Sequence, residues 1–281
     1  MNKEEYIKIV KSKLSGKPKK IMLEQIENYY DAKNSEYISQ NRFENGENVL
    51  LKKGTLLHGT YKNIEGLKSI LDDGLISSWF TYGRLSKYPS SVGVWNLKED
   101  CLLKDYINFY SGGTIEYKNF DGKKIKTSVI PYNEMKNIMN VIDTDQCFRW
   151  FIEQTKEARF MPSLVQNLVQ IGIIFDNNNN KYMENLLKYD ILNQNNINDK
   201  NVKKFVNPYY YKKFIKDRLN KDDFFTDRES AILFGIPANF IEGILVGRTY
   251  ENDKNILEEI KLLLPNCYIC NLDGKVIIGN K

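Results

Sequence analysis

The segment over residues 49–75 constrains the fold most, because its pattern changes from that of a strand to that of a helix. Residues 49–60 hold short apolar runs broken by glycine, which is typical of a strand. Apolar side chains then recur at helical spacing over residues 63–73, with Asn63 placed to cap the helix and Gly74 placed to end it in a left-handed conformation. The sequence therefore predicts a strand that leads directly into an amphipathic helix.

The composition predicts a globular, soluble chain. Hydrophobic residues make up 42% of its 281 residues, and 18 Tyr and 14 Phe supply the aromatic content of a packed interior. Every apolar run falls short of the roughly 20 residues that a membrane-spanning helix needs, and the first residues lack the apolar core of a secretory signal. We therefore expect one large domain or two small ones, acting in the cytoplasm and without a membrane span.

The positive charge of the chain is concentrated at its start. The formal net charge is +5, and residues 1–20 hold seven Lys against two Glu, which accounts for the whole excess. The rest of the chain is neutral, and with only seven Arg the protein lacks the arginine-rich basic stripe of dedicated nucleic-acid readers. We interpret residues 1–48 as a solvated, lysine-rich helical segment, broken at Gly16–Pro18.

The cysteines indicate a reducing compartment and no metal site. Four cysteines are spread along the chain without a disulfide framework. Cys267 and Cys270 form a C-x-x-C pair, but a single histidine and the lack of a second such pair leave too few ligands for zinc. We expect both to be buried thiols.

Later strands and helices follow from the same rules. Apolar runs bounded by polar turns predict strands, and the Asp-Gly pairs at 121–122 and 273–274 are typical of hairpin turns. Residues 113–221 otherwise show little pattern. The predicted strands are 92–97, 170–175, 229–234 and 236–247, and the predicted helices are 98–113 and 253–264.

The only histidine, His58, ends the first predicted strand and directly precedes Gly59 and Thr60. The chain has no G-x-S-x-G elbow, no Walker loop and no G-x-G-x-x-G motif, which argues against serine hydrolases, P-loop enzymes and Rossmann proteins. A lone histidine is more often structural than functional. This one stands where a strand leads into an amphipathic helix, so it is a candidate site residue.

The segment 54–60, followed by 63–75, resembles the NAD-binding opening of ADP-ribosyltransferases of the His-Tyr-Glu branch. That branch includes the diphtheria-toxin-like enzymes and the poly(ADP-ribose) polymerases. The resemblance implies that the Gly59 backbone pairs with the nicotinamide amide and that His58 binds the adenine-side ribose, with Thr60 beside them.

A second element of the family is an aromatic residue in a Gly-x-Tyr strand that stacks on the nicotinamide. Here Gly93-Val94-Trp95 takes that place, with Trp instead of Tyr, and Tyr106 on the following predicted helix would form the second face of the sandwich. Tyr82 is the rival for the stacking role. The alternative is that Trp95 and Tyr106 are core aromatics.

The third element is a glutamate at the head of a late strand, followed by a strand entered through proline. Residues 226–234 and 236–246 resemble this layout, which implies that Glu229 is the catalytic carboxylate. Glu242 lies inside the second of these strands, where we expect it to face outward.

Two neighbours of Glu229 extend the resemblance. Asp227 matches the position that orients the acceptor in related enzymes, where Gln or Glu is usual, and Arg228 is a structural partner or a phosphate contact. Cleavage of the nicotinamide–ribose bond creates an oxocarbenium-like centre, which a fixed carboxylate stabilises. The resemblance thus implies NAD+ as co-substrate and requires no metal.

The resemblance covers roughly residues 50–112 and 222–281, and it implies an α+β fold. We expect a split, mostly antiparallel β-sandwich of ADP-ribosyltransferase type around an NAD+ cleft. The helical segment 1–48 would precede a catalytic domain at 49–281, with a poorly legible insertion at about 113–221.

The predicted function is NAD+-dependent mono-ADP-ribosyl transfer to a macromolecular acceptor, most simply a protein. As a toxin or effector, such an enzyme would act in the cytoplasm of the cell that makes it or in that of a target cell reached by a specialised secretion system. The enzymatic alternatives are an NAD+ glycohydrolase and a nucleic-acid ADP-ribosyltransferase. The other classes are an inactive NAD- or ADP-ribose-binding module and a structural or partner-binding helical protein.

Overall fold

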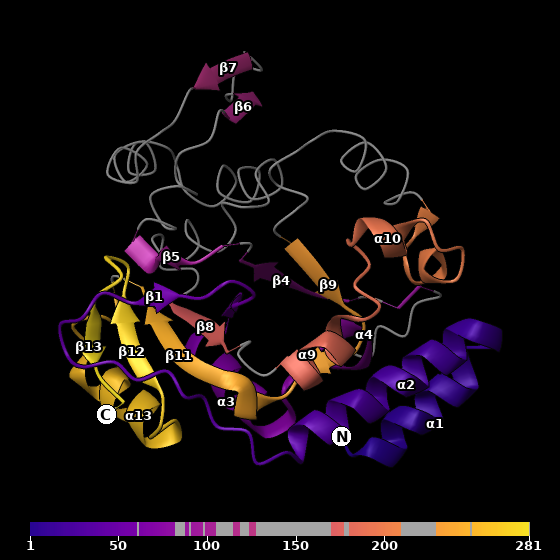
Figure 1. Cartoon of the computed structure of the whole chain (residues 1–281), viewed down its shortest axis with the longest axis horizontal. Helices are drawn as coiled ribbons and strands as arrows, with labels where there is room; N and C mark the ends of the chain where they lie inside the picture. The colour runs from indigo at the N-terminus through magenta and orange to yellow at the C-terminus, as the bar shows by residue number, and fades with distance from the viewer. Residues whose placement is uncertain are drawn as a thin grey trace.

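A computed structural model shows that the chain is α+β and built on one seven-stranded mixed sheet (Figure 1). The structure describes residues 1–60, 62–81, 88–89, 91–97, 99–104, 115–118, 124–127, 170–176, 180–208, 229–247 and 249–280. In spatial order, the strands are β13 (Val276–Ile278), β12 (Tyr268–Asn271), β11 (Ile241–Val246), β8 (Ile171–Phe175), β2 (Leu56–Thr60), β4 (Val92–Asn96) and β9 (Glu229–Ile232). The α+β class is thereby confirmed, while the split antiparallel sandwich stays a prediction.

The sheet is antiparallel at most of its junctions, and β11 and β12 form its parallel pair. Parallel neighbours need a long crossover connection. The helix α13 (Lys254–Leu263) provides it, and the Asp253 side chain caps α13 by accepting hydrogen bonds from the backbone N–H groups of Asn255 and Ile256 (3.1 and 3.2 Å). The helix predicted here is confirmed.

Three two-stranded pairs accompany the main sheet, and each pair is antiparallel. The pair β6–β7 flanks Asp121-Gly122, where the sequence predicts a hairpin. The pairs are β1 (Leu50–Leu51) with β5 (Cys101–Leu102), β3 (Leu75–Ile76) with β10 (Gly235–Ile236), and β6 (Ile115–Lys118) with β7 (Lys124–Thr127). The helix predicted over 98–113 is wrong for residues 101–102, which pair with β1 as a strand.

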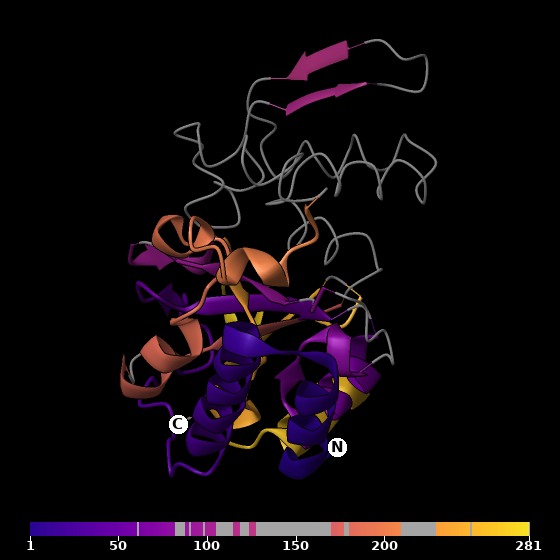
Figure 2. The same cartoon turned by 90° about the vertical axis from the view of Figure 1, so that its right-hand side faces the viewer.

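The N-terminal segment forms a helical hairpin, α1 (Lys3–Lys13) and α2 (Gly16–Lys33), whose helices lie side by side in both views (Figures 1 and 2). A capping box begins α1: the Asn2 side chain accepts a hydrogen bond from the Glu5 N–H (3.0 Å), and the Glu5 carboxylate accepts one from the Asn2 N–H (2.8 Å). The other described helices are α3 (Asn63–Asp73), α4 (Ser78–Thr81), α9 (Asn180–Leu187) and α10 (Gln194–Ile197), with 3-10 turns η2 (Val202–Phe205) and η4 (Ala238–Phe240).

Apolar clusters cover both faces of the sheet, because successive side chains of a strand point to opposite faces. In β2, Leu56 belongs to the larger cluster and Leu57 to the smaller one. The hairpin shares the larger cluster with the sheet through Tyr6, Val10, Ile21, Met22, Ile26, Tyr29 and Ala32. The N-terminal helices are therefore part of the main core.

An aromatic group seats the hairpin on the sheet. The ring centroid of Phe234, between β9 and β10, lies 5.0 Å from that of Tyr6, 5.0 Å from that of Tyr29 and 5.1 Å from that of Phe80. All three contacts are edge-to-face, the arrangement that aromatic quadrupoles favour. Residues from both helices and from α4 thus converge on a single ring.

The helix α3 has the predicted length, and it differs from the prediction only at its N-terminal end. Asn63 does not cap the helix; its side chain accepts a hydrogen bond from the Gln170 backbone N–H (2.6 Å), at the start of β8. Gly74 does end it with a positive φ of 84°. A Cβ at Gly74 would collide with the Tyr29 hydroxyl, which donates to the Asp73 carbonyl (2.7 Å).

We therefore expect Gly74→Ala to destabilise the protein by about 2–4 kcal/mol, from left-handed strain and displacement of the Tyr29 hydroxyl. The control is Gly16→Ala, because Gly16 also has a positive φ (59°) but nothing lies within 4 Å of a Cβ there. It should cost only about 1 kcal/mol. Urea unfolding measures both, and equal losses would contradict this account.

Candidate functional site

His58 lies in β2, and its ring contacts the neighbouring strand β4. Its Nδ1 atom is 3.1 Å from the Gly93 carbonyl oxygen. Because a carbonyl can only accept, Nδ1 carries the hydrogen in this contact, and Nε2 of the neutral ring is left as an acceptor. Burial lowers the pKa of His58 below its ordinary value, and the Gly93 contact opposes this shift only in part. The imidazole is therefore neutral near pH 7.

A cavity of about 540 Å³ opens beside His58, within the size range of small-molecule pockets. His58, Gly59 and Thr60 form one wall at the end of β2. Hydroxyl groups and apolar side chains supply most of the remainder. These come from α1 (Tyr6), α3 (Ser69, Ile70), α4 and its neighbours (Leu75, Ile76, Ser78, Phe80, Thr81) and the start of β4 (Ser91, Val92), while Met1, Lys62 and Asp73 add charged groups to the lining.

The helix α3 packs closely on β2 at Gly66 and Thr60, which both line the cavity. A Cβ at Gly66 would collide with the Thr60 hydroxyl, so only glycine allows the helix to approach the end of the strand this closely. Tyr6 and Phe80, which also line the cavity, are 2% and 4% exposed. Neither residue carries a local sequence signal for this site, because both reach the cavity through tertiary packing.

The structure brings the strands of His58, Trp95 and Glu229 together. In the register of the sheet, Trp95 of β4 stands opposite Leu57 of β2 on one side and opposite Glu229 of β9 on the other. The three segments that carry the resemblance, distant in sequence, thus lie on three adjacent strands. For Glu229 the description is limited to this backbone register.

Trp95 does not line the cavity with His58. It packs in the smaller apolar cluster together with Leu57 and Leu97, whereas His58 follows Leu57 and so takes the face of Leu56. Tyr82, Tyr106, Asp227 and Arg228 lie outside the described residues.

The structure corrects the expectation that Glu242 faces outward, because its side chain is only 3% exposed. Its backbone lies at a β-bulge in β11, between Ile241 and Gly243. A bulge interrupts the alternation of faces along a strand, so a periodic pattern assigns this residue wrongly. The connector between α2 and β1 covers the carboxyl group.

The Glu242 carboxylate accepts three hydrogen bonds: from Asn41 Nδ2 (2.5 Å), Tyr268 Oη (3.3 Å) and Ser39 Oγ (3.4 Å). Burial raises its pKa to about 7, and the charge of Asp176 adds to the rise, while the three hydrogen bonds oppose it. This buried carboxyl ties the connector to β11, apart from the cavity beside His58.

We expect Glu242 to make stability fall as pH rises. Between its unfolded pKa of 4.5 and its folded pKa of about 7, the folded state holds the proton that the unfolded state has lost. Glu242→Gln should remove this term, a difference of about 3 kcal/mol between pH 4 and pH 8 in urea unfolding. The control Glu36→Gln changes an exposed carboxyl of the same connector. A Glu242 variant with the wild-type pH slope would refute this.

The C-x-x-C pair is buried, as predicted. Cys267 and Cys270 are 5% and 0% exposed, and their thiols contact the carbonyl oxygens of Ile241 (3.2 Å) and Ile244 (3.6 Å). Burial raises the pKa of Cys267 to about 12 and also raises that of Cys270. The two thiols belong to different apolar clusters and so do not face one another.

Comparison of the chain with protein-family models, curated proteins and solved structures finds no match. Within the described ranges, no group of three or more His, Cys, Asp or Glu side chains could hold a metal ion. No helix among the described residues has the length and apolar character to cross a membrane.

Because His58 is the only histidine, NMR can titrate it without overlap in a protein made without a histidine tag. We expect the neutral ring to carry its proton on Nδ1 and to titrate below the ordinary value of 6.5. Long-range ¹H–¹⁵N correlations report both, and the urea-unfolded protein gives the reference. A midpoint at or above the reference, or a neutral ring protonated on Nε2, would contradict this environment.

Proposed function

We propose that the protein is an NAD+-dependent mono-ADP-ribosyltransferase that modifies a macromolecular acceptor, most simply a protein. The observation that carries the proposal is the adjacency of β2, β4 and β9, which bear the His-Gly-Thr, Gly-Val-Trp and Glu elements. A cavity of small-molecule size begins at His58 and Gly59, where the family resemblance puts the dinucleotide.

The state of His58 suits the role that the resemblance implies. A ribose hydroxyl can donate to a neutral imidazole nitrogen, and the Gly93 contact leaves Nε2 as that acceptor. The Gly59 backbone, in the same wall of the cavity, would pair with the nicotinamide amide. These contacts would hold both ends of the dinucleotide before any bond breaks.

In the proposed reaction, the bond between C1′ of the ribose and the nicotinamide nitrogen breaks, and its electron pair leaves with nicotinamide. The Glu229 carboxylate stabilises the oxocarbenium-like centre that develops at C1′. A nucleophile of the acceptor then bonds to C1′ and loses its proton. The products are ADP-ribosylated acceptor, nicotinamide and a proton.

One observation favours a second candidate, a module that binds NAD+ or ADP-ribose without cleaving it. Trp95 packs in the cluster on the other face of the sheet from His58, so it is not available in the described cavity to stack on nicotinamide. Such a module would bind the nucleotide and release no nicotinamide.

The test is nicotinamide release from NAD+ by the wild type and by Glu229→Gln, with and without a cell lysate. We expect lysate-dependent release by the wild type and a loss of about 10²–10³-fold in the variant, because one preorganised charge is removed. The control Glu258→Gln changes an exposed carboxyl on α13 and should leave the rate unchanged.

The other outcomes separate the alternatives. Release without lysate would indicate a glycohydrolase, and a labelled nucleic acid in the lysate would identify that class of acceptor. Calorimetric binding of NAD+ without release would indicate the binding module. If the protein neither binds NAD+ nor releases nicotinamide, the proposal is refuted.

A further inference from the structure

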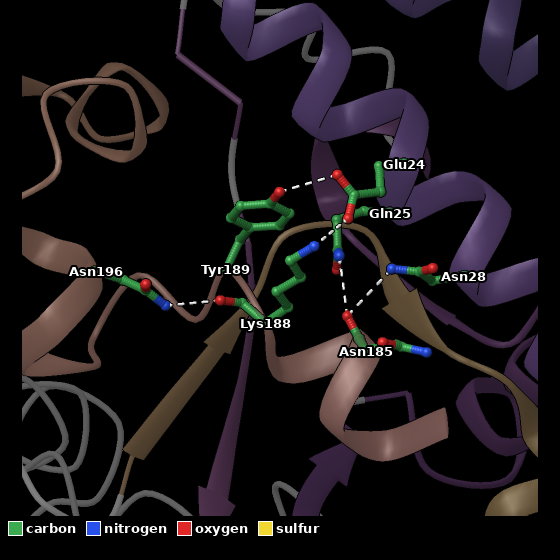
Figure 3. A network of polar contacts seen from close by, with 7 residues as sticks. All are labelled: Glu24, Gln25, Asn28, Asn185, Lys188, Tyr189 and Asn196. Atoms are coloured by element: carbon green, nitrogen blue, oxygen red, sulfur yellow. Dashed lines mark hydrogen bonds and ion pairs between the residues drawn. The ribbon is translucent and has the colours of Figure 1, made fainter. Parts of the chain in front are cut away.

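The helix α2 is bound to the segment that follows α9 through the carboxylate of Glu24 (Figure 3). Lys188 Nζ lies 2.6 Å from Glu24 Oε1, and Tyr189 Oη donates to Glu24 Oε2 at 2.9 Å. These partners hold the pKa of Glu24 below its ordinary value despite partial burial. The carboxylate therefore fixes two consecutive residues of the segment.

A second contact fixes the end of α9 on the same helix. The side-chain amides of Gln25 and Asn28 both donate to the Asn185 carbonyl, at 3.0 and 3.3 Å. Gln25 is 1% exposed, so its amide needs this partner. The segment Asn185–Asp190 thus contacts α2 at its start, through Asn185, and again through Lys188 and Tyr189, as Figure 3 shows.

The next residue, Asp190, binds the strand that carries Glu229. Its Oδ1 accepts a hydrogen bond from the Ala231 N–H of β9 (2.7 Å), and the Ile191 N–H donates to the Ala231 carbonyl (3.2 Å). Asp190 is 7% exposed. Both backbone groups of Ala231 are therefore satisfied from outside the sheet, on the side away from β4.

The turn between these contacts is itself braced. Asn196 Nδ2 donates to the carbonyls of Lys188 (2.9 Å) and Asp190 (3.2 Å), and the Asp190 N–H donates to the Leu187 carbonyl (2.9 Å). A displacement at Lys188 would therefore be carried to Asp190. The described contacts run without a break from α2 to Ala231.

The strand β9 needs such a support because it ends the described sheet and pairs with β4 on one side only. An edge strand forms backbone hydrogen bonds with one neighbouring strand, whereas an inner strand forms them with two. Ala231 lies two residues from Glu229. In a catalytic strand, a displacement of about 1 Å can reduce turnover 10²-fold.

We propose that α2 positions β9, and with it Glu229, through the segment Asn185–Asp190, with Asp190 as the positioning residue. Packing of the N-terminal hairpin on the sheet thereby supports turnover at the site. The kinetic part of this inference rests on the proposed function of Glu229.

The first test changes Asp190 and measures both nicotinamide release and hydrogen exchange of a peptide covering β9. Asp190→Leu should lower kcat at least about tenfold with the KM for NAD+ within about twofold, and should speed exchange in β9 about tenfold. Asp190→Asn keeps an acceptor oxygen for Ala231 and should restore most of both. Measurements are made well below the Tm of each variant, so a loss of overall stability alone would not give this split.

The second test compares two lysines that both pair with glutamates of α2. Lys188→Met, combined with Tyr189→Phe, removes the contacts to Glu24, whereas Lys3→Met removes the ion pair of Lys3 with Glu27 (2.5 Å), which joins α1 to α2. The first should lower kcat about threefold and speed exchange in β9. The second should change neither.

If Asp190→Leu and the double variant at Lys188 and Tyr189 both keep the wild-type hydrogen exchange in β9 and the wild-type kcat, the proposal is overturned. If Asp190→Leu does not fold, the Lys188 and Tyr189 variant decides by the same two readouts. If the wild type itself releases no nicotinamide, the proposed function fails, while hydrogen exchange in β9 still decides whether α2 supports the strand.

Discussion

The edge-to-face contacts around Phe234 are the interaction on which the rest of the molecule depends. Tyr6 of α1, Tyr29 of α2 and Phe80 of α4 all pack on this ring. Each aromatic side chain buries about 150–250 Å², worth several kcal/mol of hydrophobic stabilisation. Because Tyr6 and Phe80 also line the cavity beside His58, the same burial that fixes the hairpin shapes the candidate site.

Much of the local structure follows from the sequence, because short-range rules decide it. The strand–helix unit that ends at Gly74, the helical hairpin broken near Gly16 and the crossover helix α13 are each set by apolar spacing and a nearby glycine or cap. Asn63 and Glu242 escape these rules, because each finds its partner at a distance in the chain: Asn63 binds Gln170 and Glu242 binds Asn41.

The candidate site shows the same division more sharply. Sequence alone marks His58 as a residue at a strand end and suggests that β4 and β9 carry further elements, but it does not set the register between strands. A shift of one residue moves a side chain to the other face of a sheet. Leu57 stands opposite Trp95, and this register sends Trp95 into the smaller cluster while His58 meets the cavity.

The connector between α2 and β1 binds parts of the chain that are synthesised much later. The Asn280 side chain accepts from the Phe43 N–H (2.8 Å) and donates to the Asn41 carbonyl (2.9 Å), and Glu242 binds Ser39 and Asn41. Contacts this distant in sequence cannot form on the nascent chain until more than two hundred further residues have left the ribosome. The hairpin is in the same position, because Tyr6 and Tyr29 pack on Phe234, so the apolar faces of α1 and α2 lack this partner during most of synthesis.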